Sequence, residues 1–190
     1  MSIEQHADVR GYFRERLLTA LGQHSVKPSA ETEFYLVNLL ADYAVRPHDA
    51  MFGRTLFDMY AEASEANGAD RVRKFRDLGD NALYVCGFFS DHLQHRGVSR
   101  SYAITMGERG SSVAGAITPS FADVYVELAE RFESYVQVLD GVREEAALRT
   151  PQDIVRVYER WQKTKSPILA AQLERAGLFP VVAAERGTTH

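Results

Sequence analysis

The chain has 190 residues, of which 45% are hydrophobic and 25% charged, and its formal net charge at pH 7 is -4. These proportions are ordinary for a globular domain, so they exclude wholesale disorder and a fibrous repeat. The acidic balance, without a long basic run, disfavours a protein held on nucleic acid by net charge. No stretch approaches the roughly 18 consecutive apolar residues of a membrane span, and the first residues lack the apolar segment of a secretion signal. We therefore expect a cytoplasmic protein with no membrane partner.

Two amphipathic helices are predicted at the start of the chain. Residues 3–23 carry apolar side chains at helical spacing, with charged side chains between them. Ser29 is a suitable N-cap for a second helix over residues 30–44, because its hydroxyl can accept a hydrogen bond from the first turn. Phe34 and Val37 fall on the same stripe of this helix, so we expect both to be turned inward.

The organising element of the sequence is a central helix in residues 75–97. Its apolar residues follow spacings of three and four, which is typical of an α-helix, and they are Phe75, Leu78, Ala82, Val85 and Phe89. Further apolar residues lie off this stripe, so from about residue 82 the helix is expected to be enclosed by protein. Gly79 and Gly87 lie inside it, which indicates the close approach of another helix or of a ligand to the backbone.

Further helices are predicted on both sides of this stretch. A short one covers residues 55–67 after the connection 45–54. Ser99 can cap a helix over residues 100–117 that is rich in glycine, alanine and serine. The longest predicted helix spans residues 118–147. Helices beginning near residues 151 and 166 follow, and the tail 181–190 has no periodicity.

No convincing alternating strand is present, so the predicted fold class is all-α. We expect a compact bundle of seven to eight helices around the buried central helix, because a helix that is apolar on several sides must be enclosed. Residues 1–180 are expected to form a single domain, followed by the frayed tail 181–190.

The sharpest polar constellation is formed by Asp91, His92 and His95. A three-residue spacing places two imidazoles on one helical face, within reach of a shared metal ion. The alternative is a solvated helix end, where histidine complements the negative end of the helix dipole. The His-Glu-x-x-His pattern of metalloproteases is absent, so the sequence leaves both interpretations open.

A small-molecule site is a second hypothesis. Asp80 and Tyr84 on the central helix, with Tyr102 and Gly107 on the following one, are candidate ligand-binding residues, because tyrosines are frequent in cavities and glycine admits a ligand to the backbone. Simple core packing is the alternative. Cys86 lies in an apolar run and reads as a buried structural cysteine rather than a nucleophile.

Glycine-rich helices also line planar-cofactor pockets in haem-oxygenase-like all-α folds. In that interpretation the helix over residues 100–117 would pass over the macrocycle. His6 or His24 would then bind the iron. The similarity is one of fold class alone and names no reaction, so the cofactor stays unknown.

The stretch LGDNALYVCGFFSDHLQHRGVSRSYAITMGERG, residues 78–110, resembles a group of bacterial proteins with no established activity. They share a Leu-Gly-Asp-x-Ala-Leu-x-x-x-Gly-Phe-Phe core, followed by a tyrosine-containing Met-Gly helix. The similarity extends over about residues 30–179. It implies a bacterial helical domain and assigns no catalytic residues.

Two functions follow as hypotheses. The first is a non-enzymatic helical protein that acts through a protein partner or as a homo-oligomer, because catalytic signatures are missing and the small-residue helix implies tight packing. The second is a helical protein that binds a small molecule, a metal or haem, with enzymatic activity left open.

Overall fold

The computed structural model describes residues 3–47, 51–145, 151–165, 169–170, 173–174 and 178, leaving aside the side chains of residues 3–8, 91–92, 94, 144–145 and 151–152. The described residues form helices and turns and contain no strand, which confirms the all-α fold. The helices are α1 (Ile3–Gln23), α2 (Ala30–Ala44), α4 (Leu56–Glu65), α5 (Gly68–Phe88), α6 (Ser90–His95), α7 (Arg100–Ile117), α8 (Ala122–Glu130), α9 (Phe132–Glu145) and α10 (Pro151–Thr164).

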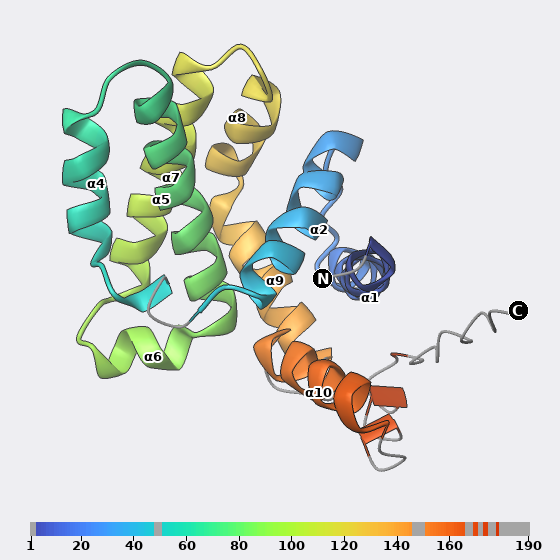
Figure 1. The fold of residues 1–190 in the computed structure, drawn as a ribbon. Coiled ribbons are helices and arrows are strands. Elements are labelled where there is room, and N and C mark those ends of the chain that lie inside the picture. The colour runs from blue at the N-terminus through green and yellow to red at the C-terminus, as the bar shows by residue number, and fades with distance from the viewer. Residues whose placement is uncertain are drawn as a thin grey trace, which may run out of the picture.

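Helix α5 is the centre of the bundle. It packs against α4, α7 and α9, and Figure 1 shows α4, α5 and α7 side by side, with α1 and α2 on the other side of the molecule from α4. Its second half is buried on all sides, from Asn81 to Phe88. The prediction of a central helix enclosed by other helices is therefore confirmed. Cys86 lies in this buried part, and burial raises the pKa of its thiol to about 12, as suits a structural cysteine.

Hydroxyl caps set the starts of several helices. The side chains of Ser29 and Ser99 accept hydrogen bonds from the backbone N–H groups of Thr32 and Tyr102, so both predicted N-caps are confirmed. Thr55 and Asp58 form a reciprocal capping box at the start of α4. These caps satisfy N–H groups that have no partner within the helix.

Helices α5 and α7 cross with their main chains almost in contact. A Cβ atom built on Gly110 would lie 2.7 Å from the Gly79 nitrogen and 2.8 Å from the Phe75 carbonyl oxygen. A Cβ on Gly79 would in turn lie 2.7 Å from the Ser111 hydroxyl oxygen. Glycine at these positions thus lets two helices approach more closely than side chains would allow, and the neighbour at Gly79 is protein.

Several helix boundaries differ from the sequence-based expectation. The central helix, expected over residues 75–97, begins at Gly68 and ends at Phe88, and residues 90–95 form the separate short helix α6. The single helix expected over residues 118–147 is interrupted at Arg131, where backbone angles of φ -123° and ψ 24° leave the helical region. The C-terminal tail 181–190 and most of the helix expected from residue 166 lie outside the described residues.

The residue before α8 adopts an unusual backbone conformation. Phe121 has φ 60° and ψ 19°, the left-handed region, and its side chain is 56% exposed. A residue with a Cβ atom is strained there by roughly 1–2 kcal/mol, whereas glycine is not.

Replacing Phe121 with Gly is expected to give a more stable protein than replacing it with Ala, by about 1 kcal/mol, because only glycine relieves the left-handed strain. Urea unfolding of both variants measures the difference in the free energy of unfolding. An alanine variant as stable as the glycine variant would show that the strain is absent.

Candidate functional site

The four residues proposed to bind a small molecule lie in different surroundings. Tyr84 is fully buried and its ring stacks on Phe88, with centroids 4.9 Å apart. Gly107 lies against the ring of Phe132, which a Cβ atom on Gly107 would overlap. Tyr102, at the start of α7, is 40% exposed. At Gly107 the close neighbour is therefore the protein's own core.

Asp80 belongs to a polar cluster. The Tyr35 hydroxyl on α2 donates a hydrogen bond of 2.7 Å to the Asp80 carboxylate. The Tyr125 ring on α8 packs edge-on against Tyr35, with centroids 5.6 Å apart. Arg76 pairs with its neighbour Asp77 at 3.3 Å on the same helix as Asp80. The cluster thus ties α2, α5 and α8 together.

Burial raises the pKa of Asp80 to about 7, even though the Tyr35 hydroxyl and the Arg76 guanidinium both favour its ionised form. Burial and the nearby Asp80 carboxylate raise the pKa of Tyr125 as well. Asp80 therefore gains a proton near neutral pH, and the tyrosines around it stay protonated.

Folding stability should depend on this proton. Because the pKa of Asp80 lies higher in the folded chain than its ordinary value of 3.8, the folded state binds the proton more tightly. The stabilisation is complete below about pH 4 and is lost as the pH rises through 7. We expect wild-type unfolding free energy to fall by about 2 kcal/mol more than that of Asp80→Asn between about pH 5 and pH 8. Parallel pH profiles in urea unfolding would contradict the assignment.

The candidate metal residues lie on α6. The side chains of Asp91 and His92 are outside the described residues, and His95 is exposed at the end of that helix. Among the described side chains, no group of three or more His, Cys, Asp or Glu residues is placed to hold a metal ion. Of the two histidines considered for haem, His24 lies beside Gly141 on α9, and the His6 side chain is not described.

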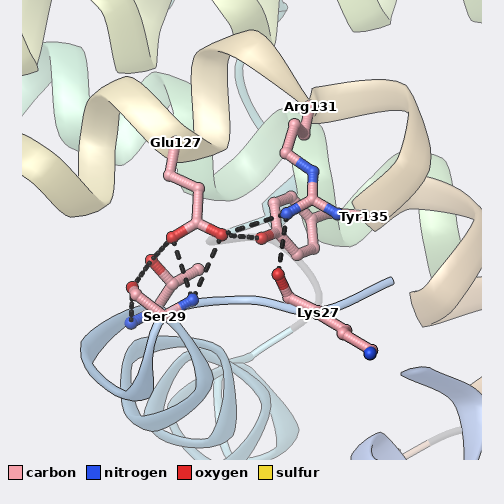
Figure 2. A network of polar contacts seen from close by, with 6 residues as sticks. Lys27, Ser29, Glu127, Arg131 and Tyr135 are labelled. Carbon is pink, nitrogen blue, oxygen red and sulfur yellow. Dashed lines mark hydrogen bonds and ion pairs between the residues drawn. The ribbon is translucent and has the colours of Figure 1, made fainter. Parts of the chain in front are cut away.

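A second polar cluster surrounds Glu127 on α8 and was not predicted from the sequence. Figure 2 shows its carboxylate above the first turn of α2. The Tyr135 hydroxyl donates to one oxygen at 2.5 Å, and the Thr32 hydroxyl donates to the other at 2.7 Å. The backbone N–H of Ser29 approaches both oxygens at 3.2 and 3.3 Å. The carboxylate therefore accepts hydrogen bonds from one side chain on α9 and one on α2. It also accepts from the backbone N–H at the N-terminus of α2, which is the positive end of that helix dipole.

Arg131 extends this cluster to the segment before α2. Its guanidinium donates to the Lys27 carbonyl oxygen at 2.9 Å and lies 3.4 Å from Glu127. Burial pushes the pKa of Glu127 upward, but the hydrogen bonds from Tyr135, Thr32 and Ser29 outweigh it and hold that pKa below its usual value. The ionised carboxylate thus joins α2 to α8 and α9, which is a structural role.

A groove of about 410 Å³ lies between the end of α2 and α10. Arg46 and Arg156 contribute guanidinium groups to it, and Asp153 and Glu159 contribute carboxylates. The Arg46 guanidinium lies 3.9 Å from the centre of the Tyr43 ring, which holds it in place. This α2–α10 groove combines both charges with apolar side chains, a composition that suits a polar small molecule.

A second groove, of about 480 Å³, lies between α1 and α2. Its lining is mostly apolar, and it is formed by Arg10, Gly11, Arg14, Ala30, Glu33, Phe34, Val37 and Asn38. We refer to it as the α1–α2 groove. Phe34 was expected to face the core, but it is 66% exposed and stands in this groove. The prediction for Phe34 was therefore wrong.

Comparison with family models, curated protein sequences and solved structures gives no match to this chain. Within the described residues, every helix is too short or too polar to cross a bilayer.

Proposed function

We propose that this chain is a non-enzymatic helical protein that acts through protein contacts, including self-association. The observation that carries the proposal is Phe34, an aromatic side chain that is 66% exposed beside an apolar groove. A large apolar side chain in water next to an apolar hollow marks a surface that gains free energy when another surface covers it.

The packing of the interior glycines supports the same proposal. A ligand against bare main chain was the alternative explanation for Gly79, Gly87 and Gly107. At each of them the close neighbour is a residue of this chain: Ser111, Leu139 and Phe132, respectively. These glycines therefore allow close helix packing. This supports a recognition site on the surface of the protein rather than at the interior glycines.

The proposal is tested by light scattering on the purified chain, combined with affinity capture from its native host followed by reciprocal capture with the purified candidate. We expect either a defined oligomer or a partner that binds in both directions. A monomer at every concentration that captures no reciprocal partner would contradict the proposal.

Small-molecule binding is the second candidate, and the α2–α10 groove favours it. Its guanidinium and carboxylate groups suit a zwitterionic ligand better than a planar macrocycle. A thermal-shift screen with amino acids, other zwitterionic metabolites, metal ions and haem tests it. A ligand at a hundred times its dissociation constant should stabilise the fold by about 2.7 kcal/mol, and Arg156→Ala should reduce that shift. If no compound in the screen changes the unfolding temperature, small-molecule binding is contradicted.

The proposed setting is the cytoplasm of a bacterium, with residues 1–180 acting as one domain. The single cysteine, buried in α5, supports a reducing compartment. The similarity of residues 78–110 to a group of bacterial proteins supports a bacterial origin.

A further inference from the structure

The turn between α4 and α5 consists of Ala66 and Asn67, and Gly68 is the first residue of α5. Figure 1 shows this turn at an outer end of the bundle. Asn67 and Gly68 are both exposed. The three asparagines of the chain are Asn38, Asn67 and Asn81, and only Asn67 precedes a glycine. An Asn-Gly pair is chemically reactive, because glycine has no Cβ atom to hinder the approach of its backbone nitrogen to the asparagine side chain.

The Asn67 side chain is not held by the helix that it precedes. It occupies the N-cap position but makes no capping hydrogen bond, unlike Ser29 and Ser99. Its backbone is extended, with φ -127° and ψ 159°, so it lies outside the regular helix. Its carbonyl oxygen accepts from the Arg71 backbone N–H at 3.4 Å, longer than the usual distance of about 3 Å. Rotation of the backbone at Asn67 therefore disturbs one weak hydrogen bond of the helix.

The Gly68 backbone nitrogen is the neighbouring nucleophile. Because Gly68 begins α5, its N–H is one of the donors for which a helix has no internal acceptor. The positive end of the helix dipole also favours the negative charge that this nitrogen gains when it loses its proton. Gly68 has φ 56°, a left-handed conformation that glycine adopts without strain, and a Cβ atom built there would meet nothing within 4 Å. The nitrogen is therefore accessible for attack.

The other two asparagines are protected by helices. Asn38 lies inside α2 and donates a hydrogen bond from its side-chain nitrogen to the Phe34 carbonyl oxygen at 2.7 Å. Asn81 lies in the buried part of α5 and donates to the Met51 carbonyl oxygen at 3.2 Å. Ring closure at either residue requires the helix to open locally, which costs more free energy in a helix interior than at a helix end. Asn67 is thus the asparagine whose surroundings permit the reaction.

We propose that Asn67 is a site of spontaneous deamidation, through attack of the Gly68 backbone nitrogen on the Asn67 side-chain amide. The nitrogen loses its proton to water and forms a bond to Cγ of Asn67. The side-chain nitrogen takes up a proton and leaves as ammonia. Water then adds to one of the two carbonyl groups of the resulting succinimide ring, and ring opening gives aspartate or isoaspartate. The net reaction consumes water and releases ammonia.

The two products affect α5 differently. Aspartate leaves the main chain unchanged and is as good an N-cap as asparagine, and its charge is favourable at the positive end of the helix. Isoaspartate directs the main chain through the former side chain and lengthens it by a methylene group. That change falls in the turn across which the Arg71 guanidinium donates to the Ser64 carbonyl oxygen at 2.8 Å. Either product adds a negative charge to the formal net charge of -4.

The test is incubation of the folded wild-type chain in mildly alkaline buffer, followed by digestion and mass spectrometry of each asparagine-containing peptide. A sample digested at the start corrects for reaction during digestion, and an isoaspartyl methyltransferase detects isoaspartate. We expect product at Asn67 to form at least about tenfold faster than at Asn38 or Asn81, a ratio that corresponds to about 1.4 kcal/mol of helix opening.

Two variants separate this mechanism from direct hydrolysis by water. Asn67→Ser removes the amide and keeps a good N-cap, so its peptide should not change in mass. Gly68→Ala keeps the amide but places a methyl group beside the attacking nitrogen, so product at Asn67 should form more slowly. Circular dichroism verifies that both variants are folded. Isoaspartate forms only through the ring, so its detection in the wild type identifies the mechanism even if Gly68→Ala does not fold.

An Asn67 that stays intact, or that reacts no faster than Asn38 and Asn81, overturns the proposal. Aspartate without isoaspartate also overturns it, because water would then attack the side-chain amide directly. An equal rate in folded Gly68→Ala contradicts attack by the Gly68 nitrogen. Each of these outcomes leaves the proposed function in protein contacts unaffected.

Discussion

Replacing Gly110 with Ala is expected to lower the free energy of unfolding by about 3 kcal/mol, a large effect for one added methyl group. The new Cβ atom would lie 2.7 Å from the Gly79 nitrogen and 2.8 Å from the Phe75 carbonyl oxygen. Both atoms belong to the main chain of α5, so no side-chain rotation can relieve the clash. The two helices must separate, and overpacking of this kind typically costs about 1–3 kcal/mol, sometimes more.

The matched control is Gly22→Ala on α1, where the added methyl group meets nothing within 4 Å. Its unfolding free energy should be unchanged or slightly higher, because alanine is the better helix former. Urea unfolding of both variants and of wild type provides the comparison. Equal stability of Gly110→Ala and wild type would mean that α5 and α7 do not touch through bare main chain.

Replacing Glu127 with Ala should lower the free energy of unfolding by about 3 kcal/mol at neutral pH. The substitution removes the acceptor of hydrogen bonds from Tyr135, Thr32 and Ser29 and leaves Arg131 without its carboxylate. Hydrogen bonds to charged groups contribute about 1.5–3 kcal/mol each when buried, and water replaces some of these because Ser29 is exposed.

The control for this change is Glu130→Ala, which removes an exposed carboxylate from the same helix. It should alter stability by no more than about 0.5 kcal/mol. The destabilisation in Glu127→Ala should shrink as the pH falls below the ordinary glutamate pKa of 4.5, because the pKa of Glu127 is lowered in the folded chain and its contribution is lost in acid. An effect as small as that of Glu130→Ala would show that the cluster contributes nothing to stability.

Features that depend on residues close together in the sequence could be predicted from the sequence alone. The caps at Ser29 and Ser99 and the burial of α5 follow from local hydrogen-bond chemistry and from helical periodicity. The small residues of α7 correctly indicated a close helix crossing. Which neighbour approaches Gly110 could not be read from the sequence, because it depends on the relative placement of α5 and α7.

Phe34 shows where periodicity fails. Its spacing to Val37 places both on one stripe, and Val37 is buried as predicted. Burial of Phe34 would require a side chain on the facing helix, and one of the α1 residues lining that groove is Gly11, which has none. A pattern within α2 carries no information about the residue that α1 presents.

The two polar clusters were beyond sequence reasoning for a related cause. Glu127 binds Thr32 and Ser29, which precede it by 95 and 98 residues, and Asp80 binds Tyr35 across 45 residues. Asp80 was a candidate as a residue type, but its tyrosine partner was not predicted. The interruption at Arg131 likewise coincides with a contact to the distant Lys27 carbonyl group. Contacts of this kind exist only once the helices have packed.

The most direct test of a function carried by the α1–α2 surface is amide hydrogen exchange on the wild-type chain at low and at high protein concentration. Self-association through the groove predicts that exchange slows at high concentration in residues 10–14 and 30–38, while α4 and α7 are unaffected. Exchange rates that do not change with concentration, or slowing confined to other helices, would contradict it.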